Sequence, residues 1–271
     1  MNRRPVSAQA AAALAAAARA GPYFAVEPRD GGAGWHPLSA LVSDPAVLRE
    51  RVAHAGRVLA RGAGIAPAAV PPRVAASVVF GGLASRLVSP ALGAAVLGGV
   101  VPVLTVDDLW WRPVDGGPWP LAARPADGVA VGGLAAAGQL GAAAALISEH
   151  CVQGIAGPVS AAFGTAFRLS PQVRRGNVAS ALAGAAGVLA AACPERAGAA
   201  WDLTAAILAQ PPLRGAGELV QPDPAQPRRF LVRRSCCLIY RIPGAGTCGD
   251  CVLRTAAARP AVAGRSPLSP G

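Results

Sequence analysis

Four of the six cysteines lie within sixteen consecutive residues near the C-terminus, in the stretch RRSCCLIYRIPGAGTCGDCVLR. Cys236 and Cys237 are adjacent, ten residues follow, and Cys248 and Cys251 form a C-x2-C pair. Three glycines around the second pair permit the tight turn that such a pair needs. Neighbouring side chains of an extended chain point to opposite faces, so the first pair needs a local bend before its thiols converge. The pattern predicts a loop that brings its four thiols together.

Several kinds of site contain four clustered cysteines. A structural zinc site usually has two to four residues between the cysteines of each half, whereas one half here is CC. Two disulfides need an oxidising compartment, and the N-terminus is a poor signal peptide because its apolar stretch is nearly all Ala and is interrupted by Arg19. Inert buried thiols do not explain why the rest of the chain holds only two cysteines. A [2Fe-2S] cluster takes two thiolates per iron and fits both the count and the clustering.

Arginines surround this segment, and Asp250 is the single acid within it. Positive charges near a cluster stabilise its reduced, more negative form, so these arginines are expected to raise the reduction potential or to dock an acidic electron donor. They are Arg228, Arg229, Arg233, Arg234, Arg241 and Arg254.

The rest of the chain predicts a mainly α-helical single domain with a few short strands. With 271 residues, 53% of them hydrophobic and 14% charged, the chain can bury a sizeable core. Ser43 or Asp44 followed by Pro45 predicts a helix start, and the apolar spacing continues to Gly62. Residues 71–99 are predicted to form two helices that meet near Ser89-Pro90, because proline disfavours helix in the residue before it.

Further helices are expected over 134–164, 170–191 and 196–213, and short strands within 106–133. The chain is divided as an Ala-rich extension (1–20), a helical body (21–220), a linker with the cluster-binding segment (221–255) and a disordered tail (256–271). The linker is predicted from three prolines in QPDPAQP.

The formal net charge of +11 favours anionic partners. Nucleic acid is not expected, because aromatic residues are few and no basic recognition motif occurs. Three uncharged runs reach the length of a membrane span: Leu87–Val106, Gly128–Ser148 and Asn177–Pro194. Ala, Gly and Pro dilute them, so they are expected to be buried helices, with peripheral membrane contact as an alternative.

Other candidate residues are assigned to the core. Cys151 and Cys193 lie in apolar helical contexts and are expected to be ordinary core thiols. Trp110, Trp111 and Trp119 are expected to anchor the core or a loop.

The cysteine segment resembles the C-terminal signature of the FhuF-type ferric siderophore reductases, in which a C-C-x10-C-x2-C set binds a [2Fe-2S] cluster. The adjacent pair, the spacing of ten, the YR-P-G-G-CGDC frame and the flanking arginines all agree. Residues 84–112 and 176–184 are similar to the helical body of that family, although this chain has Arg175 where a Trp often stands.

The resemblance implies that Cys236, Cys237, Cys248 and Cys251 hold the cluster. It further implies one-electron reduction of a ferric siderophore, of the hydroxamate type, with release of Fe2+. The reaction is expected in the cytoplasm, either free or beside the inner face of the membrane, with electrons from a ferredoxin, a flavodoxin or a flavin reductase. The alternatives are a zinc-stabilised binding protein without enzymatic activity, and a [2Fe-2S] electron carrier or redox sensor without a siderophore substrate.

Overall fold

The computed structural model describes residues 6–115, 117–134, 136–223 and 228–253. The expected tail (256–271), Arg254 and part of the expected linker (224–227) lie outside the described residues. The prediction of a mainly α-helical fold with short strands is confirmed. The helices are α1 Val6–Ala18, α2 Ala40–Ser43, α3 Pro45–Gly62, α4 Pro72–Gly98, α5 Ala137–Leu146, α6 Gly157–Phe167, α7 Pro171–Ala192 and α8 Ala197–Leu208. The strands are β1 Glu27–Pro28, β2 His36–Pro37, β3 Val100–Val103, β4 Leu109–Trp111, β5 Leu121–Ala123, β6 Asp127–Ala130, β7 Gly217–Val220 and β8 Phe230–Arg233.

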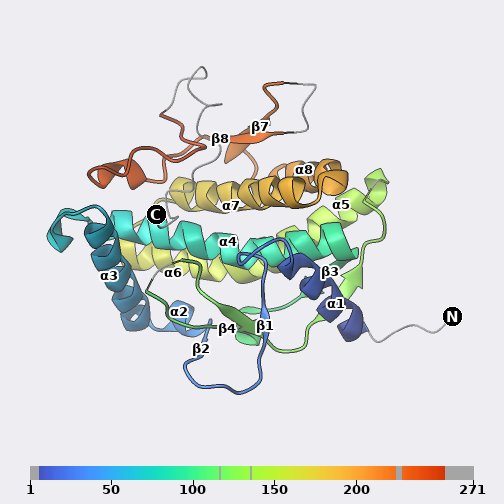
Figure 1. Cartoon of the computed structure of the whole chain (residues 1–271), viewed down its shortest axis with the longest axis horizontal. Coiled ribbons are helices and arrows are strands. Elements are labelled where there is room, and N and C mark those ends of the chain that lie inside the picture. Colours follow the sequence, from blue (N-terminus) through green and yellow to red (C-terminus); the bar gives the residue numbers. More distant parts are fainter. Residues whose placement is uncertain (1–5, 116, 135, 224–227, 254–271) are drawn as a thin grey trace.

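Helix α4 runs through the middle of the molecule, with α7 beside it and α1 packed near its C-terminal end (Figure 1). Small residues allow these backbones to approach closely. A Cβ on Gly98 would overlap the Cβ of Ala13, and one on Gly93 would lie 2.8 Å from the Cβ of Ala17. The abundance of Ala and Gly therefore corresponds to close helix packing, and α1, within the expected extension 1–20, lies against α4. The boundaries at 20, 220 and 255 stay predictions.

The expected break near Ser89-Pro90 is wrong, because α4 continues through Pro90 as one helix. Ser89, Pro90 and Leu92 are all buried there. Packing of apolar surface on every side of this turn outweighs the hydrogen bond that proline cannot donate and the local preference of the residue before it.

The predicted start and end of α3 are confirmed. The Asp44 carboxylate accepts hydrogen bonds from the amides of Ala46, at 2.8 Å, and Val47, while Pro45 occupies the first helical position. Leu48 and Val52 on its apolar face are buried.

The strands form three small sheets, with the orders β1-β5-β4-β2, β3-β6 and β7-β8. Trp111 on β4 is buried and stacks on Trp119, with ring centroids 4.9 Å apart, and on His36 at 5.0 Å. Trp111 and Trp119 thus anchor the core and a loop, as predicted, whereas Trp110 is half-buried beneath Arg29 and Arg124 and does not join the core. Before β4, the η2 turn (Val106–Asp108) is closed by Asp108, and the hydrogen bond from Thr105 lowers the pKa of that carboxyl.

A π-helix, η3 (Ile147–Ala156), joins α5 to α6 and packs against α4. Cys151 is buried in it, its Sγ lies 3.1 Å from the Leu87 carbonyl oxygen, and burial raises the pKa of its thiol to about 12. It is a core thiol, as predicted. Cys193 is half-buried at the end of α7.

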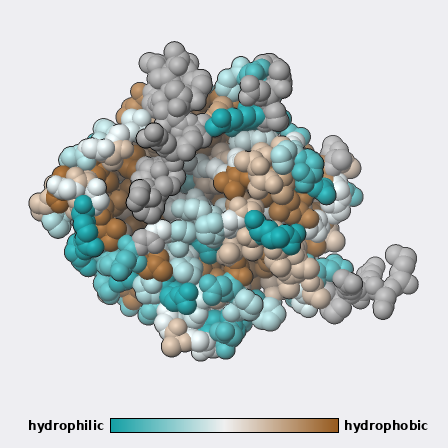
Figure 2. All heavy atoms as spheres, viewed as in Figure 1, coloured by the Kyte–Doolittle hydropathy of each residue, from teal (hydrophilic) through white to brown (hydrophobic). Residues whose placement is uncertain are grey.

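Among the described helices, α4 has the length and apolar composition of a membrane span, and 72% of its most apolar window is buried inside the protein. Hydrophilic residues are scattered between small apolar patches on the face shown in Figure 2. Burial of this kind is what the core helix of a folded domain shows.

Candidate metal centre

The β7-β8 hairpin leads into the cysteine segment, and both lie over α7 (Figure 1). After β8 the chain passes Cys236 and Cys237, makes the short η5 turn (Ile239–Arg241) and returns through the glycine-rich stretch to Cys248 and Cys251. The amide of Arg233 donates to the Asp250 carbonyl oxygen at 3.3 Å, which closes this loop on itself.

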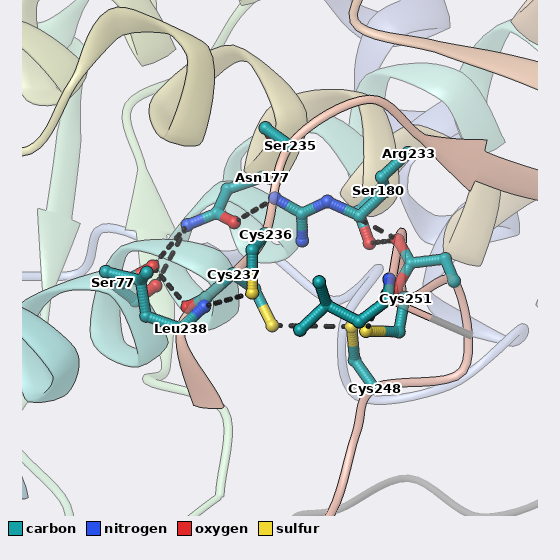
Figure 3. Close-up of polar contacts among 12 residues, drawn as sticks. Ser77, Asn177, Ser180, Arg233, Ser235, Cys236, Cys237, Leu238, Cys248 and Cys251 are labelled. Carbon is teal, nitrogen blue, oxygen red and sulfur yellow. Dashed lines mark hydrogen bonds and ion pairs between the residues drawn. The ribbon is translucent and has the colours of Figure 1, made fainter. Parts of the chain in front are cut away.

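The loop brings the four predicted cysteines together (Figure 3). The Sγ atoms of Cys237 and Cys248 lie 3.3 Å apart, and the amide of Cys251 donates to the Cys248 carbonyl oxygen at 3.2 Å in the same turn. Cys251 is buried and the other three are half-buried. The four thiols therefore lie in one small region of the loop, with Cys237 and Cys248 in contact.

Backbone geometry aims amides at these sulfurs. Leu238 adopts a left-handed conformation, with φ at +71°, which supplies the bend expected after the adjacent pair. Its amide donates to Cys236 Sγ at 3.3 Å, and the Leu253 amide donates to Cys251 Sγ at 3.4 Å. Hydrogen bonds from backbone amides stabilise thiolate sulfur and tune the potential of iron–sulfur centres.

The thiols differ in acidity because of these contacts. The hydrogen bond that Cys237 shares with Cys248 lowers the pKa of Cys237 to about 6 and raises that of Cys248. Burial raises the pKa of Cys236.

This donor set fits a [2Fe-2S] cluster. Among the described residues, no three His, Cys, Asp or Glu side chains converge closely enough to hold one metal ion. A four-thiolate zinc site requires such convergence, whereas a two-iron cluster requires one pair of thiolates for each iron. The loop presents one such pair directly, Cys237 and Cys248, with Cys236 and Cys251 beside it.

A buried polar network attaches the loop to the helical body (Figure 3). The Ser77 hydroxyl on α4 donates to the Cys237 carbonyl oxygen at 2.7 Å, and the Asn177 amide on α7 donates to the Ser77 carbonyl oxygen at 2.9 Å. Arg233 Nη2 donates to Asn177 Oδ1 at 2.6 Å. The Ser180 hydroxyl bonds to the Asp250 carboxylate.

Close approach of the loop to α7 depends on Gly176. A Cβ at this position would overlap the Ser235 hydroxyl and would lie 2.8 Å from Arg233 Nη2. A larger residue at this position would require the Ser235 hydroxyl and the Arg233 guanidinium to move.

A cavity of about 710 Å³ opens beside the cysteines. Cys237 and Cys248 line it, together with Arg233 and Asp250. Its uncharged polar side chains are Tyr23, Ser77, Ser85, Ser89, Asn177 and Ser180.

One wall of the cavity, residues 20–24, is held in place by the buried Arg86. Its guanidinium donates to the carbonyl oxygens of Pro22, Ala25 (at 2.7 Å) and Trp119 (at 2.6 Å).

The described arginines near the cluster segment occupy different environments. Arg233 is buried, whereas Arg228, Arg234 and Arg241 are exposed. Arg229 forms a 2.9 Å ion pair with Asp202. These arginines, which the sequence alone does not distinguish, therefore differ in exposure and pairing.

Sequence reasoning missed Ser77, Asn177 and Ser180 as parts of the site. Asn177 and Ser180 lie in the stretch 176–184, which had been matched only to a helical body. Nothing in the local sequence distinguishes Ser77 from the other serines of α4.

Comparison with known proteins bears on the cysteine segment. Residues 233–253 match the family model described as the FhuF 2Fe-2S C-terminal domain, and the four cysteines fit its cluster-binding motif. A search of curated proteins gives no match to this chain. The match and the paired thiols together identify residues 233–253 as an FhuF-type segment that binds a [2Fe-2S] cluster.

Proposed function

We propose that this protein reduces a ferric siderophore by one electron and releases the iron as Fe2+. The observation that carries the proposal is the cavity of about 710 Å³ whose wall includes Cys237 and Cys248. Its volume is in the range of small-molecule sites. A chelate bound there lies next to two of the cluster-binding residues, and the FhuF-type segment supports a redox role of the siderophore-reductase kind.

Cys236, Cys237, Cys248 and Cys251 would hold the cluster, which would supply one electron at a time when bound. Hard oxygen donors such as hydroxamates prefer Fe3+ and hold Fe2+ more weakly. One electron from an external donor therefore converts Fe3+ to Fe2+ in the chelate and loosens it, with no bond to the protein formed or broken.

The lining of the cavity favours a chelate of low charge. Arg233 and Asp250 are its charged side chains among the described residues, and they carry opposite signs. The hydroxyl and amide groups of Ser77, Ser180 and Asn177 can hydrogen-bond to chelate oxygens. An iron(III) trihydroxamate centre is neutral, whereas a tris-catecholate carries three negative charges that this wall does not compensate.

The electron donor is proposed to be an acidic one-electron carrier such as a ferredoxin or flavodoxin, or a flavin reductase. Arg234 and Arg241 are exposed on the cluster segment, and Tyr240 beside them is 43% exposed. Tyr240 offers an apolar contact, and Arg234 and Arg241 surround it with positive charge. A surface of this kind beside the cysteine segment suits a transient acidic partner. We place the reaction in the cytoplasm, where such carriers operate.

The test uses anaerobic protein reduced beforehand with dithionite, freed of excess reductant and mixed with an iron(III) trihydroxamate. One Fe2+ trapped by a ferrous chelator for each cluster reoxidised supports the proposal. Reoxidation by air with no Fe2+ from the chelate would instead indicate an electron carrier or a redox sensor.

A blocking variant links the activity to the cavity. A Cβ on Gly184, which lines the cavity, would meet no described atom within 4 Å, so Gly184→Leu is designed to narrow the cavity with its longer side chain. Gly198, exposed on α8 with the same open surroundings, provides the matched variant Gly198→Leu. Gly184→Leu is expected to slow chelate reduction by at least about tenfold while keeping the cluster, and Gly198→Leu is not.

A further inference from the structure

Arg233 is a buried cation beside the cluster-binding cysteines. It ends β8, three residues before Cys236, and only 3% of the residue is exposed. Its Nη2 donates to Asn177 Oδ1 at 2.6 Å. Its Nε is buried without a hydrogen-bond partner among the described residues, at 3.9 Å from Asp250 Oδ2.

The charge of Arg233 is only partly compensated. Asn177 is neutral, so its hydrogen bond fixes the guanidinium without cancelling the charge. Asp250 is the facing anion, but its carboxylate also bonds to the Ser180 hydroxyl and does not form a close ion pair with Arg233. A partly compensated positive charge therefore remains in a poorly solvated position.

This position makes Arg233 electrostatically different from its neighbours. Arg234 and Arg241 are exposed, where water and salt screen their charges. A charge in a medium of lower dielectric constant acts more strongly over the same distance. Arg233 also lines the same cavity as Cys237 and Cys248, two of the cysteines of the cluster-binding motif.

We propose that Arg233 is the residue that sets the reduction potential of the bound cluster, and that Asn177 is the positioning residue that holds it. A cluster held by these cysteines would take one electron from an external donor and gain one negative charge. No bond or proton at Arg233 changes. The fixed positive charge stabilises the reduced form and raises the potential. The inference rests on the [2Fe-2S] segment and is independent of the siderophore substrate.

The test is a redox titration of substrate-free holoprotein, followed by visible absorption, with iron quantified for every variant. Arg233→Gln removes the buried charge, and Arg234→Gln removes a charge of the same kind from the adjacent exposed residue. At a fixed applied potential, Arg233→Gln is expected to lower the ratio of reduced to oxidised protein by about tenfold, which is about 59 mV for a one-electron couple. Arg234→Gln is expected to lower it by less than about twofold.

Two more variants distinguish an effect of the Arg233 charge on the potential from an effect on the folding of the loop. Arg233→Lys keeps the charge and is expected to restore most of the potential. Asn177→Asp keeps Arg233 but places a carboxylate beside its guanidinium. Like Arg233→Gln, it is expected to lower the ratio of reduced to oxidised protein. A merely structural role would change cluster content or stability without this ordering of potentials.

The proposal is overturned if Arg233→Gln and Arg234→Gln shift the ratio equally, or if neither shifts it. If Arg233→Gln retains no iron, the decision rests on Arg233→Lys and Asn177→Asp. Wild-type potentials in both, or loss of iron from both, would show that Arg233 only supports the fold of the loop.

Discussion

The hydroxyl of Ser77 donates a 2.7 Å hydrogen bond to the carbonyl oxygen of Cys237, across 160 positions of sequence. This contact joins the centre of the helical body to the loop that carries the cluster-binding thiols. It means that the stability of the metal centre depends on α4 as well as on the cysteine segment.

Ser77→Ala is therefore expected to speed the loss of iron. The variant leaves the Cys237 carbonyl oxygen without this donor in a part-buried site, at a cost of about 1–3 kcal/mol. The measurement is the decay of cluster absorbance in the presence of an iron chelator. Ser85 lines the same cavity, but its hydroxyl bonds to the Gly81 carbonyl oxygen of its own helix. A Ser85→Ala variant that loses iron as fast as Ser77→Ala would contradict the assignment.

Gly176→Ala is expected to displace the cysteine loop from α7. The new methyl group overlaps the Ser235 hydroxyl and lies 2.8 Å from Arg233 Nη2, so it is expected to perturb the hydrogen bonds of these groups to the Gln172 carbonyl oxygen and to Asn177. Overpacking of this kind costs roughly 1–3 kcal/mol, so iron per chain after purification should fall. Gly198→Ala, in open space on α8, should hold as much iron as the wild type and be slightly more stable.

Gly98→Ala tests the packing of α1 on α4, away from the metal centre. The added methyl group overlaps Ala13 in α1, so the free energy of unfolding should fall by roughly 1–3 kcal/mol in urea denaturation. Gly82→Ala lies in the same helix with nothing within 4 Å of the new methyl group, and should unfold at a urea concentration no lower than the wild type. Equal unfolding curves for the two variants would refute the close α1–α4 contact.

Electron delivery is expected to depend on salt. If an acidic carrier docks at Arg234 and Arg241, its rate of cluster reduction should drop as ionic strength rises, because screening weakens the steering of opposite charges. Arg241→Glu should slow reduction by roughly tenfold at low salt, and Arg196→Glu, with the same change in net charge beyond the end of α7, should slow it much less. Equal effects of the two substitutions would show that net charge, rather than this surface, governs the encounter.

The sequence allowed the proximity of the four cysteines to be predicted because their spacing is local. A CC pair, a ten-residue interval and a C-x2-C turn lie within one loop, and the structure folds that loop so that the sulfurs of Cys237 and Cys248 meet. The helices with good caps, such as α3 after Asp44, were predictable for the same reason.

The parts that could not be predicted depend on contacts between distant segments. Pro90 favours a break by local rules, and only burial on all sides keeps α4 continuous. Ser77 and Asn177 join the site through side chains that are 100 residues apart. Arg233 is buried and Arg234 is exposed. Two adjacent arginines in the sequence give no sign of this difference.

The most direct test of the central claim is the visible absorption spectrum of anaerobically purified protein before and after dithionite, with iron and zinc quantified on the same sample. A red-brown protein with about two irons per chain that bleaches on reduction is the expected result. The Cys248→Ser substitution should abolish the red-brown absorbance, and Cys193→Ser should leave this absorbance unchanged. A colourless protein that binds one zinc even after attempted cluster reconstitution, or equal loss of iron in both variants, would contradict the account.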